Sequence, residues 1–269
     1  MGKIIAVLNE KGGVAKTTTV KNISVGLASH GKKVLAVDLD PSANLTTSLG
    51  YFKLEEDTKT ILNLFNLAEK CEDIPDNMGI LNHVEGIDLI PSTKTFHDYE
   101  AILQGAMQKE VVLRRILYPL KDKYDYIFID CPAGLGIFVT NAMFAADSVI
   151  IPVQPQTLGA AAMMSLFSYI NLIRKMNGTG VKPELEGILF TMVKTNVNND
   201  TVIENHFRET YKGKQFIYET HIPNSVRFSE SDGEGQSIYK YAPKSASADV
   251  YGRLVNEFLD REGVLNEQK

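Results

Sequence analysis

The stretch KGGVAKTT, residues 11–18, decides how this chain folds, because of what stands on each side of it. It follows the apolar run Lys3–Asn9, which is typical of a buried parallel strand, and it leads into a helical pattern over Thr17–Ser29. In a glycine-rich turn between a strand and a helix, backbone N–H groups point inward and the helix N-terminus adds partial positive charge. The sequence therefore predicts a loop that binds a polyphosphate.

Individual side chains of this loop have separate expected roles. Lys16 is expected to reach the β- and γ-phosphates of a nucleoside triphosphate, and the Thr17 hydroxyl to bind Mg²⁺. The loop departs from the ordinary pattern G-x-x-x-x-G-K-[ST], since Glu10 and Ala15 stand where that pattern has glycine. The residues predicted to contact the nucleotide here are Lys11, Gly12, Gly13, Val14, Ala15, Lys16, Thr17 and Thr18.

Further apolar runs alternate with helical patterns along the chain. Strands are predicted at Lys33–Asp38, Ile87–Ile90, Tyr126–Asp130, Val149–Val153, Leu185–Val193 and Phe216–Ile222. The clearest later helices cover Leu158–Met176 and about Ala248–Arg261, whereas Tyr51–Asn82 is predicted to hold surface loops and short helices. This order indicates an α/β fold with a mostly parallel, twisted sheet flanked by helices on both faces. Because no repeat or linker divides the chain, a single domain over residues 1–269 is expected.

Composition excludes several classes of protein. Hydrophobic residues make up 44% and charged residues 23% of the chain, which is close to globular usage and excludes a disordered or fibrous protein. The two cysteines, Cys71 and Cys131, exclude a disulfide framework and a Cys-rich metal site within one chain. With no apolar run of ~18 residues and no signal peptide, we expect a cytoplasmic protein. The formal net charge of −5 gives no whole-chain reason to expect nucleic acid.

Two stretches place carboxylates near the predicted phosphate site. Asp38 and Asp40 are two residues apart, so on an extended chain their side chains face the same side. Both are expected to point towards the phosphates, because α/β sheets bind ligands at the carboxyl ends of their strands. Tyr126–Asp130 is an apolar run that ends in an acid, which is typical of a carboxylate that supports Mg²⁺. An Asp before Pro41 is also a common helix cap, so a structural role for it stays open.

Together these motifs resemble the partition and positioning ATPases of the ParA/MinD superfamily, which have a P-loop NTPase-like fold with a variant Walker A loop. The family's loop K-G-G-x-x-K-[ST] matches residues 11–17, and all fixed letters of its D-x-D-P-x-x-N motif occur in residues 38–44. Its late segment I-P-R-N-V-R is similar to residues 222–227, where Asn224 replaces the first arginine. The resemblance covers nearly the whole chain and implies that ATP and Mg²⁺ are the cofactors.

The resemblance also implies roles for residues around the phosphates. Lys11 would cross to the phosphates of a second subunit, so that two subunits form a homodimer around two ATP molecules. Lys16 and Lys11 would thus act together with Asp40, which would orient or activate the water that attacks the γ-phosphate. Asp38 would support the Mg²⁺ shell, for which Thr17 and Asp130 are the other expected metal residues. A lysine supplied in trans would act as an arginine finger does.

The late motif carries the implied base and DNA contacts. Pro223 and Asn224 would lie beside the adenine, and Arg227 aligns with a residue implicated in DNA contact in the family. Arg227 could equally be an ordinary surface arginine. Composition adds no support for a DNA surface here, because basic and acidic residues balance between Lys194 and Lys244. Only folding and dimer formation could gather those lysines onto one face.

The leading hypothesis is a ParA/Soj-type partition ATPase of the nucleoid. It would bind duplex DNA nonspecifically as an ATP dimer, release it on hydrolysis and segregate a plasmid or chromosome, stimulated by a ParB-like centromere-binding protein. The loop starts so early that no space is expected for an N-terminal helix-turn-helix domain. A MinD-type membrane-positioning ATPase is disfavoured by the acidic residues in Arg253–Lys269, so we expect no membrane partner. A small-molecule ligase or synthetase on the same fold stays open.

Overall fold

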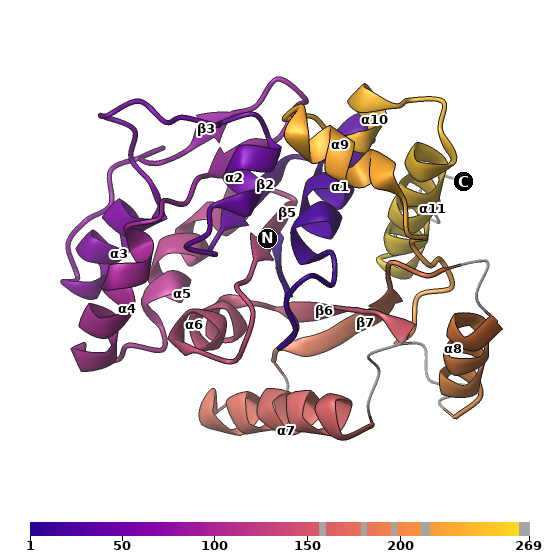
Figure 1. The fold of residues 1–269 in the computed structure, drawn as a ribbon. Helices are drawn as coiled ribbons and strands as arrows, with labels where there is room; N and C mark the ends of the chain where they lie inside the picture. Colours follow the sequence, from indigo (N-terminus) through magenta and orange to yellow (C-terminus); the bar gives the residue numbers. More distant parts are fainter. Residues whose placement is uncertain (156–159, 179–181, 195–197, 211–215, 264–269) are drawn as a thin grey trace.

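A seven-stranded sheet with the order β3-β4-β2-β5-β1-β6-β7 runs through the protein (Figure 1). The computed structural model describes residues 1–155, 160–178, 182–194, 198–210 and 216–263. The strands are β1 (Lys3–Val7), β2 (Val34–Asp38), β3 (Leu81–Asn82), β4 (Asp88–Ile90), β5 (Tyr126–Asp130), β6 (Ser148–Val153) and β7 (Glu184–Phe190). Only β3 pairs antiparallel to its neighbour, β4. The predicted, mostly parallel α/β sheet is therefore confirmed.

Helices cover both faces of this sheet (Figure 1). Against one face lie α1 (Lys16–Ser29), α2 (Asn44–Ser48), α9 (Val226–Gly233), α10 (Ile238–Tyr241) and α11 (Ala246–Arg261). Against the other lie α3 (Ile61–Glu69), α4 (Phe96–Gly105), α5 (Val112–Leu117), α6 (Ile137–Ala145) and α7 (Ala160–Met176), with the 3-10 helix η1 (Tyr118–Asp122) after α5. The remaining helix, α8 (Asn198–Thr210), places Phe207 edge-on against Phe190 of β7 with ring centroids 5.7 Å apart.

Alternation along the strands supplies both cores. In β1, Ile4 and Ala6 join the cluster under α3–α7, while Ile5 and Val7 join the cluster under α1 and α11. This is the two-residue period of a strand that is buried on both faces. Since β1, β2 and β5 are parallel neighbours, the loops that follow them come together at one edge of the sheet, and that edge carries the candidate site.

The two later predicted helices are present. In α7, Leu166, Ile170 and Ile173 of the predicted apolar stripe are buried and Phe167 is partly buried. The start of this prediction, Leu158, and the side chain of Met163 lie outside the described part of the chain. In α11, the three predicted core residues are all buried, namely Val250, Leu254 and Phe258. Their position against the sheet follows from the helical spacing of apolar residues.

One predicted strand is wrong. Phe216–Ile222 makes only an isolated bridge to β7 at Ile217, and a further bridge joins Pro223 to Val193. Between these bridges, the backbone N–H groups of Glu219 and Thr220 donate to the Glu257 carboxylate at 2.7 and 2.8 Å. These two N–H groups therefore bond to a side chain of α11 and not to a neighbouring strand, so the segment does not form a continuous strand.

The prediction for Tyr51–Asn82 also needs correction. Its helix α3 is not superficial, because Ile61, Leu64 and Phe65 are at most 1% exposed and lie in the core. The spacing of these residues is that of a helix with one buried face. Polar residues flank α3 on either side, so the overall polarity of Tyr51–Asn82 obscures this spacing.

Candidate functional site

The predicted phosphate loop joins β1 to α1, as expected. Its turn contains two residues in the left-handed region, Gly13 with φ of 69° and Ala15 with φ of 62° and ψ of 33°. Ala15 is the residue that precedes α1, so no side chain caps the first N–H groups of that helix. Uncapped N–H groups at a helix N-terminus attract an anion. The loop is thus prepared for a phosphate.

Ala15 occupies a conformation that glycine adopts without cost. For a residue with a Cβ atom, the left-handed region costs about 1–2 kcal/mol. The neighbouring Val14 is buried, and its carbonyl accepts a hydrogen bond from the Thr191 hydroxyl at 3.0 Å. This anchor of the loop on the residue after β7 shows how the fold holds Ala15 in place. Val14 itself contributes no side chain to the cavity described below.

The two lysines of the loop differ in exposure. Lys16 is 7% exposed, and its Nζ donates to the carbonyl of Lys11 at 3.2 Å, so its side chain folds across the loop. The side chain of Lys11 is exposed. Its backbone N–H donates to Asn9 Oδ1 at 3.0 Å, which fixes the start of the loop while the ammonium stays accessible. Lys16 is therefore held against the loop, whereas the side chain of Lys11 stays exposed.

Thr17 and Asp130 meet directly although they lie 113 residues apart in the sequence. The Thr17 hydroxyl donates to Asp130 Oδ2 at 2.7 Å, and Asp130 has no exposed surface. Its other oxygen, Oδ1, is buried and accepts no hydrogen bond from the residues that the structure describes. A hydroxyl beside a carboxylate with one unused oxygen is a donor set that suits Mg²⁺. These residues therefore fit a magnesium ion at the end of β5.

Asp38 is held by protein groups instead. Its Oδ2 accepts from the backbone N–H and the hydroxyl of Thr46 at 2.8 and 2.7 Å, and its Oδ1 accepts from the N–H of Asp40 at 3.2 Å. Burial raises the pKa of Asp38 to about 7, against the lowering by the Thr46 hydrogen bonds. Burial, and then the charge of Asp38, also raise the pKa of Asp130. A divalent cation would offset both effects.

Asp38 and Asp40 do not both reach the predicted phosphate site. Only Asp40 lines the cavity, and its Oδ1 accepts from the Ser42 N–H at 2.8 Å. Asp38 lies behind it without exposed surface. Because β2 ends at Asp38, the alternation of an extended strand does not continue to Asp40, and of the two carboxylates Asp40 alone lines the cavity.

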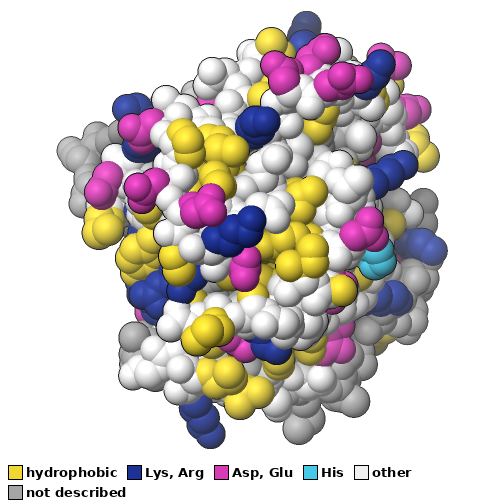
Figure 2. Space-filling model, turned by 90° about the vertical axis from the view of Figure 1, so that its left-hand side faces the viewer, with side chains coloured by type: hydrophobic (Ala, Val, Ile, Leu, Met, Phe, Trp, Pro, Cys, Tyr) yellow, Lys and Arg dark blue, Asp and Glu magenta, His cyan; other side chains and the backbone are white. Residues whose placement is uncertain are grey.

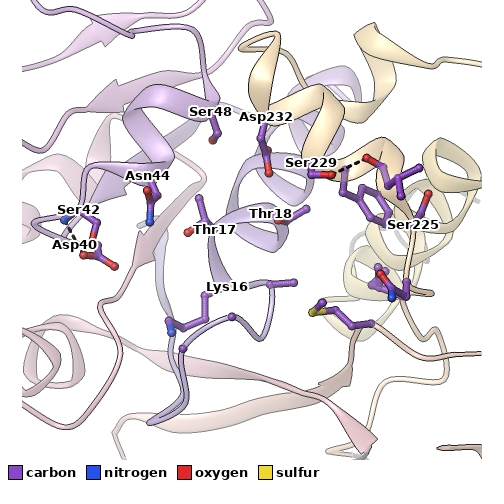
Figure 3. A pocket seen from close by; sticks show the side chains of 18 of the residues that line it. Lys16, Thr17, Thr18, Asp40, Ser42, Asn44, Ser48, Ser225, Ser229 and Asp232 are labelled. Atoms are coloured by element: carbon purple, nitrogen blue, oxygen red, sulfur yellow. Dashed lines mark hydrogen bonds between the residues drawn. The ribbon is translucent and has the colours of Figure 1, made fainter.

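A cavity of about 690 Å³ connects the loop with the late motif. Its floor includes Gly12, Gly13, Ala15, Lys16, Thr17 and Thr18, and its far side includes Pro223, Asn224 and Ser225. Figure 3 shows Lys16, Thr17 and Thr18 on one side of this space, with Ser229 and Asp232 of α9 on another. The cavity thus joins the predicted phosphate and base contacts in one continuous site.

Arg227 lies outside this cavity. It is exposed in the first turn of α9, where its N–H donates to the side chain of the N-cap residue Ser225 at 3.3 Å. The structure therefore separates Arg227 from Pro223 and Asn224, although the three residues belong to one sequence motif. An exposed position is compatible with contact to a macromolecule.

Several residues of the site escape prediction from the sequence. Thr46 holds Asp38, and Asp232 lines the cavity while it pairs with Lys21 of α1. The helical spacing of Thr17 and Lys21, four residues apart, places both on one face of α1. That spacing could have indicated Lys21, whereas nothing in the sequence points to its partner on α9.

Comparisons with known proteins agree with this geometry. A family model described as an AAA domain matches residues 2–186. The chain is 37% identical over 257 residues to the sporulation initiation inhibitor protein Soj of Bacillus subtilis (strain 168), which covers 96% of this chain and 98% of that protein. It is 35% identical over 266 residues to the chromosome partitioning protein ParA of Myxococcus xanthus (strain DK1622), with 97% of this chain and 89% of that protein covered.

Solved structures with bound nucleotides are also similar. One is cobyrinic acid a,c-diamide synthase from Mycobacterium smegmatis with bound ADP and magnesium, at a TM-score of 0.77 and 27% identity over 95% of this chain and 93% of that one. Another is the septum site-determining protein MinD complexed with Mg-ADP from Pyrococcus horikoshii OT3, at a TM-score of 0.75 and 26% identity over 98% of each chain. Both combine this fold with a magnesium nucleotide.

Proposed function

This chain belongs to the ParA/MinD superfamily of ATPases, and we propose that it is a DNA partition ATPase that binds and hydrolyses ATP with Mg²⁺. The observation that carries the proposal is the contact of Thr17 with the buried Asp130 beside an uncapped phosphate loop. When bound, Mg²⁺ supplies charge neutralisation at the phosphates. Thr17 and Asp130 would hold the ion, and Lys16 would bind the phosphates. Asp38 would support the site indirectly, through its hydrogen bonds with Thr46 and Asp40.

Asp40 is proposed as the residue that orients or activates the attacking water. It is the carboxylate of the D-x-D pair that lines the cavity, and Ser42 N–H holds its Oδ1. Pro223 and Asn224 would contact the adenine at the other end of the same cavity. All of these groups belong to the single ATPase domain that we propose for residues 1–269.

The exposed Lys11 supports a homodimer formed on ATP binding. Among the described residues, none forms an ion pair with the Lys11 ammonium. This ammonium can therefore reach the phosphates of a second molecule. The homodimer would bind nonspecific duplex DNA on the nucleoid, in the cytoplasm, and a ParB-like centromere-binding protein would stimulate hydrolysis. Relatives named Soj and ParA support this partner class.

The DNA surface would have to come from assembly. Figure 2 shows basic and acidic side chains interspersed over one face of the molecule, and the chain has a formal net charge of −5. Nonspecific DNA binding is driven by lysine and arginine contacts to phosphates. Arg227, exposed on α9, is the proposed contact that the sequence motif supports.

A membrane-positioning role is less well supported by this fold. The apolar face of α11 is used in the core, where Leu254 and Phe258 have no exposed surface, so this helix has no free apolar face for lipid. None of the helices in the described residues is long and apolar enough to cross a membrane. The likeness to cobyrinic acid a,c-diamide synthase supports a ligase function as the alternative, and the test below distinguishes it from a partition ATPase.

Sedimentation with MgATP, with MgADP and with no nucleotide tests the proposal, and each sample is repeated with duplex DNA. We expect a dimer only with MgATP, and DNA binding only by that dimer. The logarithm of DNA affinity should fall by roughly 0.9 per neutralised phosphate for each tenfold rise in salt. Lys11→Ala is the matched variant, because it should bind ATP and remain monomeric. ATP turnover that needs a small-molecule acceptor and no DNA would favour the ligase.

A further inference from the structure

Lys21 is a lysine without any exposed surface in the middle of α1. It stands one helical turn after Thr17, on the helix that begins at the phosphate loop. Leaving a buried ammonium without partners would cost several kcal/mol. Its surroundings must therefore compensate the charge, and they decide what the residue does.

Four acceptors surround the Lys21 ammonium, and they come from two separate stretches of the chain. From α2 comes the carbonyl of Ser48, at 3.4 Å. From α9 and the turn after it come Asp232 Oδ1 at 2.5 Å, the Gln236 carbonyl at 2.7 Å and Ser231 Oγ at 3.4 Å. Burial lowers the pKa of Lys21, whereas the charge of Asp232 opposes this shift. Asp232 is thus the side chain that contributes most to offsetting the burial of this ammonium.

All of the acceptors except the Gln236 carbonyl lie at helix C-termini. Ser48 is the last residue of α2, and Asp232 lies in the last turn of α9. Both positions carry partial negative charge from the helix dipole, and an Asp in the last turn adds to it. One ammonium between the two ends therefore stabilises both helices where they approach each other. Figure 3 shows Ser48 and Asp232 together at the same end of the cavity.

The two helices carry opposite ends of the candidate site. The loop that enters α2 contains Asp40, and the loop that enters α9 contains Pro223 and Asn224. We propose that Lys21 is a positioning residue for the ATPase reaction: through Ser48 and Asp232 it fixes the spacing between the Asp40 end and the base end of the cavity. This inference rests on the proposed function, since it gives Lys21 a role only if the cavity binds ATP.

Lys21→Met tests the proposal, because methionine keeps most of the length of the side chain and removes its charge. We expect the affinity of the folded protein for a fluorescent ATP analogue with Mg²⁺ to fall about tenfold or more, within the range of couplings between protein sites. The Michaelis constant should rise and the turnover number should fall as well, because Asp40 is displaced along with the base contacts. Circular dichroism gives the folded fraction by which each value is corrected.

Lys121→Met is the matched control. Lys121 is 6% exposed and pairs with Asp147 at 2.7 Å, and Asp147 also binds the N–H of Ile4, at the end of β1 remote from the phosphate loop. This variant removes a similarly buried lysine and leaves Asp147 with its second partner, Lys182, so it should lose stability and keep its ATP affinity. Equal affinity in the wild type and in folded Lys21→Met would overturn the positioning role, as would equal losses in the two variants.

Asp232→Asn decides the question if Lys21→Met does not fold. The Asp232 side chain is 35% exposed, and asparagine keeps its shape and an acceptor oxygen for the Lys21 ammonium, so this change disturbs the fold less than loss of the lysine. If Asp232 only lined the cavity, removal of its negative charge would strengthen the binding of a polyphosphate. The positioning role predicts the opposite sign, a loss of affinity, and a gain would overturn it. A wild-type protein that binds no ATP analogue would overturn the proposed function itself.

Discussion

Asp38 and Asp130 are register partners on the neighbouring parallel strands β2 and β5, and neither has any exposed surface. Each is the last residue of its strand, so two carboxyl groups are buried side by side at the edge of the sheet where the phosphate loop lies. Thr46 satisfies one of them, and Thr17 satisfies only one oxygen of the other. Both oxygens of Asp38 therefore accept hydrogen bonds, whereas Asp130 Oδ1 accepts none from the residues that the structure describes.

Stability should depend on pH because of Asp38. The pKa of this group is raised from 3.8 to about 7, so between these values the folded state keeps a proton that the unfolded state has lost. The stabilisation is complete below the unfolded pKa and is lost as the pH rises through about 7. We expect the melting temperature of the ligand-free protein to fall over this window. The Asp38→Asn variant, which cannot titrate there, should show a flatter curve, and an identical curve would contradict the assignment.

Ala15→Gly should stabilise the protein by about 1 kcal/mol, because glycine relieves the left-handed strain and loses part of this gain to greater freedom in the unfolded chain. Chemical denaturation measures the difference. Ala28→Gly, in the same helix at an ordinary helical position, is the control and should destabilise by about 1 kcal/mol. A loss of stability in Ala15→Gly would show that the loop gains nothing from glycine.

The two loop lysines should separate binding from assembly. Lys16→Ala removes the ammonium that folds across the loop, and we expect it to abolish ATP binding. Lys11→Ala removes an exposed ammonium, so ATP should still bind to the monomer while the dimer is lost. Isothermal titration calorimetry and sedimentation distinguish the two outcomes. Unchanged ATP affinity in Lys16→Ala would discard the phosphate-loop assignment.

Asp40→Ala should keep ATP and DNA binding and stop turnover, since the cavity loses the carboxylate proposed to orient water. We expect a loss of about 10²–10⁴ in the turnover number and a dimer that persists with ATP. Phosphate release measures the first effect and sedimentation the second. Ser42→Gly is a control that keeps the N–H donor to Asp40 and should leave turnover largely intact. Normal turnover in Asp40→Ala would remove Asp40 from the mechanism.

Local patterns predicted much of the fold and part of the site. The strands before the phosphate loop and before Asp38 and Asp130 lie within a few residues of their predicted places, because each is a continuous apolar run. The strand predicted at Phe216–Ile222 is not continuous, because two of its N–H groups, those of Glu219 and Thr220, donate to Glu257 of a distant helix. A run of apolar residues cannot reveal such a competitor.

The sequence by itself determined the phosphate loop, the strands next to it and the apolar faces that form the two cores, because each depends on neighbours along the chain. Only the tertiary structure decided that Thr46 donates hydrogen bonds to Asp38 and that Thr17 donates one to Asp130. The same holds for the ion pair of Lys21 with Asp232, which is 211 residues away. These contacts depend on which strands lie side by side and on where helices end in space. A sequence pattern contains no distance between residues that lie far apart along the chain, because such distances arise from the packing of the whole chain.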